Sequence, residues 1–263
     1  MKRLMIAIAA MLAGACTPHA ENAPDTDEPA LPGVTLPVAD QANNRMEALS
    51  EASGRWCTGD GVWCATSAGA DVTLTRDGQH AGAIAVEESG ENDSWEVWPV
   101  IVRIGQIDDT ALFGVAMKTH QMYSGGGGEA TQLVLYRVSD GVANEVTRMP
   151  LSASSDVRAC FNQEDETLRA GACHDQYRFV SRISLDESVS EGAPRVLLET
   201  AAGSFPGRVT RDADSLEAAP LTQADLVWAH DETCSYRRIY SQGSDGLYAP
   251  NQPLPACTDY LEP

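Results

Sequence analysis

Two apolar runs separated by four consecutive glycines constrain the fold of this chain more than any other feature. The runs Ala111–Thr119 and Thr131–Val138 are rich in β-forming residues, and each is long enough to be a central strand. Glycine lacks a Cβ atom and adopts positive φ readily, so Gly125–Gly128 is predicted to be the loop that joins them. The stretch therefore predicts a long β-hairpin, beside which other strands can pair on both sides.

Short strand-forming runs separated by turn residues fill most of the remaining chain. They are predicted at Gly61–Thr66, Asp71–Arg76, Ala81–Glu87, Glu96–Ile104, Asn144–Pro150, Val157–Phe161, Gln176–Asp186, Arg195–Thr200, Asp225–His230, Ser235–Ser241 and Leu247–Ala249. A short helix is predicted at Arg45–Ser53. The pattern predicts an all-β fold of antiparallel sheets, with a β-sandwich favoured. A propeller-like meander is the alternative, although no clear repeat of about 40 residues is present.

Six of the seven cysteines fall into three pairs of sequence neighbours, and the seventh, Cys16, follows an export signal. An even number of locally paired cysteines is typical of disulfides formed in an oxidising compartment. The predicted bridges are Cys57–Cys64, Cys160–Cys173 and Cys234–Cys257. Zinc is the competing interpretation, but the sequence has no C-x2-C pair and no histidine at zinc-finger spacing.

Residues 1–15 have the features of a signal peptide, because a charged start precedes an apolar run, Leu4–Ala13, that is too short to span a bilayer. Cleavage is predicted before Cys16, and lipidation there would account for the odd cysteine; ordinary secretion is the alternative. Residues 16–44, rich in Pro, Ala and acidic residues, are predicted to be a flexible tether, and residues 45–263 a single disulfide-stapled domain. The predicted location is the periplasm or the outer membrane, through an N-terminal lipid anchor.

The chain is strongly acidic, with 38 Asp and Glu against 18 Lys and Arg and a net charge of −20. This charge disfavours nucleic acid and anionic lipid headgroups as partners. Solubility is the favoured interpretation of the charge, and cation binding is the more specific alternative. Glu164, Asp165 and Glu166 lie together between Cys160 and Cys173. Carboxylates suit calcium, although the EF-hand spacing is absent. Calcium is therefore the candidate metal, and no other cofactor is expected.

Several runs are similar to parts of exported bacterial β proteins of the lipoprotein type, a group whose activity is uncharacterised. The runs are Tyr123–Gly128 followed by Leu133–Val138, Arg158–Phe161, Ala172–Tyr177 and Cys234–Arg238. The likeness covers most of residues 56–260 and rests on a Tyr-Ser-Gly-Gly-Gly hairpin and paired cysteines. It implies an exported all-β protein, and it implies no particular reaction or ligand.

No residues at a recognisable catalytic spacing are present. The sequence lacks a G-x-S-x-G elbow, and the glycine run lacks the Lys-Ser/Thr of a phosphate-binding loop. The favoured function is therefore a non-enzymatic binding or structural module of the cell envelope, with an envelope protein or a glycan as partner. The alternative is an envelope hydrolase whose catalytic residues are unknown.

The hairpin tip is the candidate binding surface, because an exposed glycine run there is flanked by polarisable side chains. Its residues are His120, Tyr123, Gly125, Gly126, Gly127 and Gly128. Five tryptophans offer a second possibility, a carbohydrate or peptide site, but core packing is the commoner use of this residue and is favoured. They are Trp56, Trp63, Trp95, Trp98 and Trp228.

Overall fold

The computed structural model describes residues 40–41, 44–87, 90, 92–105, 109–186, 188, 192–211 and 213–262. The predicted signal peptide, Cys16 with its predicted lipid, and nearly all of the predicted tether lie outside these residues. Strands dominate the part that is described, and no helix in that part has the length and apolar character needed to cross a membrane.

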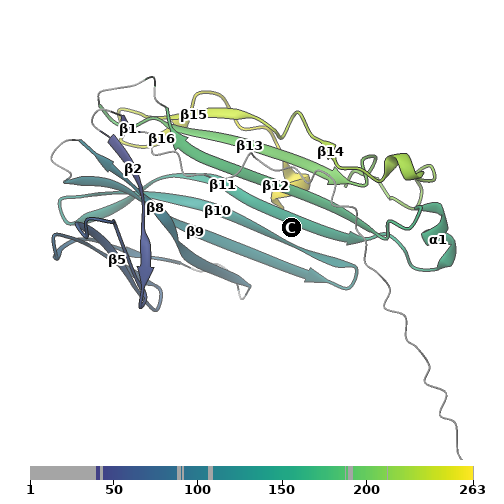
Figure 1. The fold of residues 1–263 in the computed structure, drawn as a ribbon, viewed down its shortest axis with the longest axis horizontal. Coiled ribbons are helices and arrows are strands. Elements are labelled where there is room, and N and C mark those ends of the chain that lie inside the picture. Colours follow the sequence, from purple (N-terminus) through teal and green to yellow (C-terminus); the bar gives the residue numbers. More distant parts are fainter. Residues whose placement is uncertain are drawn as a thin grey trace, which may run out of the picture.

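Two antiparallel sheets make up the fold (Figure 1). The large sheet has eleven strands: β1 (Asp40–Gln41), β2 (Asn44–Ala48), β8 (Asp93–Ile104), β9 (Thr110–Tyr123), β10 (Gly126–Ser139), β11 (Val142–Arg158), β12 (His174–Leu185), β13 (Val196–Phe205), β14 (Ala229–His230), β15 (Arg237–Gln242) and β16 (Tyr248–Pro250). The small sheet has five: β3 (Ser50–Ala52), β4 (Arg55–Cys57), β5 (Trp63–Ala68), β6 (Asp71–Arg76) and β7 (Gln79–Ala85). Two short α-helices, α1 (Gln163–Leu168) and α2 (Thr258–Leu261), and a 3-10 turn, Gln223–Asp225, complete the described elements.

The small sheet packs against one face of the large sheet, over strands β8 to β10. Alternate residues of β6, Val72 and Leu74, point into this interface and are fully buried. From the large sheet, Phe113 and Val115 meet them. Burying each such side chain contributes about 1.5–3 kcal/mol. The predicted all-β antiparallel fold is confirmed, and its packing is that of a sandwich.

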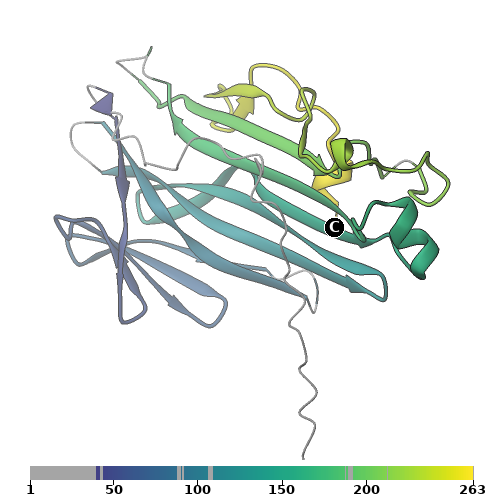
Figure 2. The same cartoon turned by 45° about the vertical axis from the view of Figure 1, so that its right-hand side comes forward.

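A second core forms where two strands of the large sheet separate. β11 and β12 pair only where Ser152–Arg158 lies opposite His174–Val180, and beyond that segment they diverge (Figures 1 and 2). A register shift between Thr131 and Gln132 of β10 marks a bulge in β11 near the point of divergence, and a bulge bends its strand. Buried residues from both parts of the sheet fill the space: they include Leu133, Leu135, Met149, Ile183, Leu198 and Tyr240.

The C-terminal segment covers the same face as the small sheet, farther along the strands. Tyr260 of α2 packs edge-on against Tyr177 of β12, with ring centroids 6.1 Å apart. The Cys234–Cys257 disulfide joins this segment to the loop before β15. A third core, which includes Phe179 and Ala202, lies beneath it.

The central hairpin is longer and tighter than predicted. β9 and β10 pair as far as Tyr123 and Gly126, and they turn through Ser124 and Gly125 alone. Gly126–Gly128 are strand residues, paired with β9 on one side and β11 on the other. The prediction of a four-glycine loop is therefore wrong, because backbone pairing on both sides holds most of the run extended.

The predicted helix at Arg45–Ser53 is also wrong, since this segment forms β2 and β3. Asn44 and Met46 are buried at alternate positions, which is the period of a strand. β2 pairs with β8, a partner far along the chain that local helix propensity does not register.

All three predicted disulfides are present. Cys57 and Cys64 are direct cross-strand partners in β4 and β5. The Cys160–Cys173 bridge encloses α1 and leads from β11 into β12. Each bridge restricts the unfolded chain and contributes about 2–4 kcal/mol.

Candidate functional site

A row of four residues from four adjacent strands forms the floor of a cleft at one end of the large sheet. Tyr123 of β9 is the register partner of Gly126 in β10. Gly126 is in turn the partner of Val157 in β11, and Val157 that of Asp175 in β12. Partners directly opposite each other point to the same face of a sheet. Tyr123, Val157 and Asp175 accordingly all line the cleft.

Glycine is required at position 126, where neighbouring backbone leaves no room for a Cβ atom, and the space beside Gly127 is occupied by a Met122 side chain. A Cβ atom on Gly126 would lie 1.9 Å from the Asp156 carbonyl oxygen and 3.2 Å from Cε2 of Tyr123. A Cβ atom on Gly127 would lie 2.7 Å from Sδ of Met122. Tyr123 and Met122 therefore fold back over β10 in space that a larger residue would occupy. Gly126 and Gly127 thus form a glycine strip, a part of β10 without side chains over which the Tyr123 ring lies.

The cleft has a volume of about 480 Å³. Figures 1 and 2 show that the β9–β10 turn and α1, which lie next to its lining residues, are at the same end of the molecule. Its walls come from the segment that follows β11, the start of β12 and the loop that follows β13. The lining residues are Tyr123, Val157, Arg158, Ala159, Phe161, Asp175, Tyr177, Thr210, Arg211, Ala213, Asp214, Ser215 and Leu216. A volume of this size is within the range of small-molecule sites.

Two aromatic rings at the cleft are unusually exposed. Phe161 is 61% exposed and Tyr123 is 41% exposed, whereas Phe113 and Phe179 are fully buried. The Arg158 guanidinium lies over the Phe161 ring, with its carbon 5.1 Å from the ring centroid. Exposed aromatic side chains cost solvation, so their concentration in one hollow favours a binding surface.

Arg158 and Arg211 supply positive charge to the same cleft. Arg158 donates from Nε to the Cys160 carbonyl oxygen at 2.7 Å, which holds its side chain beside Phe161. Arg211 donates to the carbonyl oxygens of Asp259 and Glu262, at 3.0 and 2.7 Å. In each case a neutral carbonyl accepts the bond, so the guanidinium charge is not cancelled by it.

Asp175 anchors one wall of the cleft from beneath. Its carboxylate accepts hydrogen bonds from the Arg169 guanidinium and the Ser215 hydroxyl, and the side chains of Asp175 and Arg169 are each only 4% exposed. Burial raises the pKa of Asp175, and the Ser215 hydrogen bond and the Arg169 charge oppose the rise. Burial also raises the pKa of the neighbouring Tyr177 hydroxyl. These groups are structural, because they tie the loop after β13 to the start of β12.

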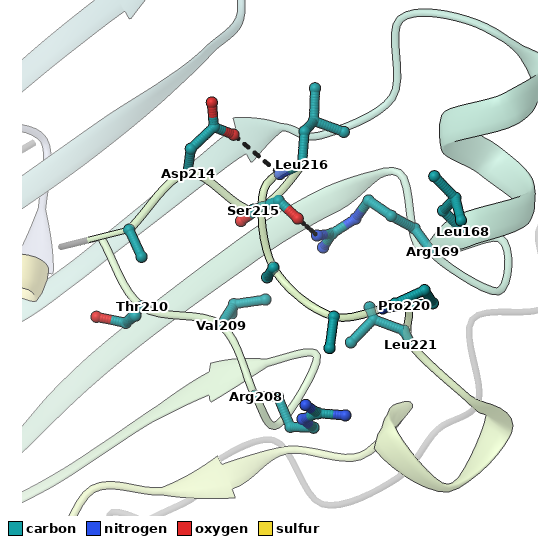
Figure 3. Close-up of a pocket in the computed structure, with 13 residues that line it drawn as sticks. Leu168, Arg169, Arg208, Val209, Thr210, Asp214, Ser215, Leu216, Pro220 and Leu221 are labelled. Atoms are coloured by element: carbon teal, nitrogen blue, oxygen red, sulfur yellow. Dashed lines mark hydrogen bonds between the residues drawn. The ribbon is translucent and has the colours of Figure 1, made fainter.

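The other side of that loop carries a smaller hollow of about 60 Å³ (Figure 3). Leu168, Val209 and Leu221 line it, and Arg169 donates across it to the Ser215 carbonyl oxygen at 3.4 Å. This hollow is too small for more than a side chain or a few waters. A third hollow, of about 560 Å³, is lined by residues that include Met117 and Arg148, and none of its described lining residues is aromatic. We therefore treat the cleft that holds the exposed rings as the candidate site.

The acidic residues proposed as calcium ligands lie in the first turn of α1. Asp165 caps the helix, accepting from the backbone N–H groups of Phe161 and Asn162 at 2.8 and 3.2 Å. Glu164 and Glu166 are exposed. Within the described part of the chain, no group of three or more His, Cys, Asp or Glu side chains is placed to hold a metal ion.

His120 does not join Tyr123 in the cleft. The two residues are three apart on a continuous strand, so their side chains point to opposite faces. His120 is exposed beside its partner Glu129. Of the predicted tip, only Tyr123 lines the cleft, and Gly126 lies in its floor.

The tryptophans follow the packing interpretation where their surroundings are resolved. Trp63 and Trp98 are buried in two of the cores. Trp228 packs against Phe205, with ring centroids 5.8 Å apart. None of the five lines the cleft.

One serine and one histidine approach each other elsewhere. Ser235 Oγ lies 3.5 Å from Nδ1 of His230, and Asp231 is adjacent in sequence. However, the Asp231 carboxylate accepts from Tyr260 and from the backbone of Thr233 and Cys234, and Ser235 Oγ accepts from the backbone of Ala202. The Asp231 carboxylate and the Ser235 hydroxyl are therefore held by structural partners. They do not form a hydrogen-bonded chain through the His230 imidazole, as a catalytic triad does.

Phe161, Arg158 and Arg211 are the residues of the site that sequence reasoning missed. Arg158 and Phe161 lie on either side of Cys160 in the sequence, so their position beside a predicted disulfide could have identified them. Nothing in the sequence places Arg211 near them, because the loop after β13 reaches the cleft only in three dimensions.

Comparisons with known proteins add no assignment to this geometry. No protein-family model matches the chain, no curated protein matches it, and no solved structure matches it.

Proposed function

We propose that the protein is an exported binding module of the cell envelope and that the cleft at the glycine-hairpin end is its binding surface. The observation that carries this proposal is the convergence of two exposed aromatic rings, Tyr123 and Phe161, with Arg158 in one hollow. The floor of that hollow is a continuous ladder from β9 to β12, which keeps the site preformed. The partner would be an envelope protein or a glycan.

The disulfides support the proposed location in the cell envelope. Three disulfides are typical of an oxidising, extracellular or periplasmic environment. We further propose that Cys16 carries a lipid and that the following residues act as a spacer to the domain. Replacing Cys16 with Ser and following incorporation of radiolabelled palmitate tests the anchor, and equal labelling of both proteins would overturn it.

The binding surface is tested by capture from envelope extract with the full-length protein. Tyr123→Ala removes a ring from the cleft, and Val142→Ala is the matched control, because Val142 is exposed at the opposite end of the long strands. We expect the wild type and Val142→Ala to capture the same partner and Tyr123→Ala to lose it. Identical capture by all three, with unchanged circular dichroism, would exclude the cleft.

A hydrolase is the second candidate, and the Ser235–His230 approach is the observation that favours it. Its weakness is that the neighbouring carboxylate and the hydroxyl are engaged by other groups. A panel of ester, amide and glycoside substrates, with Ser235→Ala as control, decides this question. Turnover that disappears in Ser235→Ala would establish the enzyme.

A further inference from the structure

We propose that the cleft selects an acidic glycan, a saccharide that carries carboxylate groups on its sugar rings. This inference rests on the proposed function and adds the chemical class of the ligand. Two features of the cleft carry it: guanidinium groups without a carboxylate partner among the described residues, and exposed ring faces.

The cleft holds two arginines that are not neutralised by an ion pair with any described residue. Many described arginines face a carboxylate, as Arg148 faces Glu145 at 2.7 Å and Arg182 faces Glu199 at 2.5 Å. In the part of the chain that is described, no carboxylate forms an ion pair with Arg158 or Arg211, although the net charge is −20. Both side chains are exposed, and both line the cleft. Guanidinium groups bind carboxylates through paired N–H donors, so Arg158 and Arg211 can bind an anion, although the carboxylates of Asp175 and Asp214 also line the cleft.

The aromatic rings supply the second part of the recognition. One face of the Phe161 ring is occupied by Arg158, and the Tyr123 ring lies over the side-chain-free strip at Gly126. The negative face of an aromatic ring attracts the partly positive C–H groups that cover one side of a sugar ring. The Tyr123 hydroxyl can also exchange hydrogen bonds with sugar hydroxyls. A ring and a guanidinium side by side therefore match a sugar that carries a carboxylate.

The middle of the floor offers no strand edge to an extended peptide. Peptides that add to a sheet need an unpaired strand edge. At this cleft, β10 and β11 are each paired on both sides, through Gly126 with Tyr123 and Val157, and through Val157 with Asp175. A ligand over the middle of the floor must therefore bind through side chains on the sheet face. The outer edge of β9 from His120 to Tyr123 has no partner strand among the described residues, because pairing with β8 ends at Thr119.

The experiment is isothermal titration of the full-length protein with oligogalacturonic acid and with its fully methyl-esterified form. Esterification removes the charge but keeps the sugar rings and their C–H faces. We expect the acid to bind at least about tenfold more tightly than the ester, which corresponds to about 1.4 kcal/mol. The affinity for the acid should also fall with added salt.

Arg158→Ala should weaken binding of the acid by about tenfold or more, and Phe161→Ala should weaken acid and ester alike. Arg148→Ala is the matched control, because Arg148 is an exposed arginine outside the cleft that is paired with Glu145. We expect this control to bind as the wild type does. Circular dichroism of each variant establishes that it is folded.

Equal binding of acid and ester, no binding of either, tighter binding of an acidic peptide, or unchanged affinity in Arg158→Ala would each overturn the ligand class. These results would leave the proposed function intact if capture from envelope extract still depends on Tyr123. Capture that does not depend on Tyr123 would overturn the proposed function itself.

Discussion

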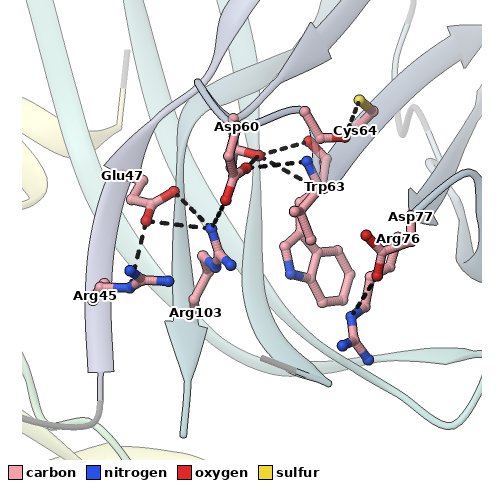
Figure 4. A network of polar contacts seen from close by, with 11 residues as sticks. Arg45, Glu47, Asp60, Trp63, Cys64, Arg76, Asp77 and Arg103 are labelled. Atoms are coloured by element: carbon pink, nitrogen blue, oxygen red, sulfur yellow. Dashed lines mark hydrogen bonds and ion pairs between the residues drawn. The ribbon is translucent and has the colours of Figure 1, made fainter. Parts of the chain in front are cut away.

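Arg103, buried in β8 of the large sheet, donates a hydrogen bond of 2.6 Å to Asp60, which lies in the disulfide loop of the small sheet (Figure 4). Glu47 of β2 approaches the same guanidinium at 3.3 Å. The Thr58 hydroxyl also donates to Asp60, at 2.6 Å. The Arg103 guanidinium of the large sheet is thus ion-paired with Asp60 of the small sheet, at the edge of the core that the two sheets share.

We predict that Asp60→Asn removes part of the acid sensitivity of folding. Hydrogen bonds from Thr58 and Arg103 lower the pKa of Asp60 in the folded state. A lowered pKa adds stability above the unfolded-state value, near pH 4, and this stability is lost as the pH falls below it. Urea denaturation at pH 7 and pH 3 should show a smaller loss for Asp60→Asn than for wild type. Asp77→Asn, at an exposed carboxylate, should lose as much as wild type does.

Gly126→Ala should destabilise the protein by about 1–3 kcal/mol, because its φ of 153° and the nearby Asp156 oxygen leave no room for a Cβ atom. The same substitution should displace the Tyr123 ring and weaken binding at the cleft. Gly125→Ala is the control, since nothing lies within 4 Å of a Cβ atom there. Equal thermal stability of the two variants would contradict the role assigned to the glycine strip.

The buried pair of Arg169 and Asp175 should be costly to break. Asp175→Asn leaves a buried guanidinium without its charge partner, and a loss of about 3–5 kcal/mol is expected. Arg148→Ala breaks an exposed pair and should change the unfolding free energy by less than about 1 kcal/mol. Urea denaturation of both variants checks the difference, and a mild effect of Asp175→Asn would mean that water reaches this wall of the cleft.

Tyr248→Phe is expected to be neutral or to stabilise the protein by about 1 kcal/mol, because the buried Tyr248 hydroxyl has no hydrogen-bond partner among the described residues. Burial raises the pKa of Tyr248 to about 12, so its contribution to stability is lost as the pH rises from about 10 toward that value. Tyr248→Phe should therefore resist alkaline unfolding better than wild type. Tyr260→Phe is the contrasting variant, because it loses a hydrogen bond of 3.1 Å to Asp231 and should be less stable at pH 7.

Local sequence signals were enough for the fold class and the disulfides. Strand-forming runs and turn residues act over a few positions, so they reveal β9, β10 and β12 without knowledge of their partners. Cysteines that are close in sequence are close in space in most arrangements of the chain, and the three predicted bridges formed. Tyr123 was also identified from its place beside the glycine run.

Only the tertiary structure decided what surrounds Tyr123 and what the glycines do. The register between β10 and β11 turns Gly126–Gly128 from a loop into a strand, and that register depends on backbone pairing between distant segments. The same non-local pairing turned the predicted helix at Arg45–Ser53 into β2 and β3. It also placed Arg158, Phe161 and Arg211 around one cleft, because side chains from three separate segments meet only after the sheet has formed. Local composition therefore determined which segments are strands, while long-range pairing determined which side chains share a site.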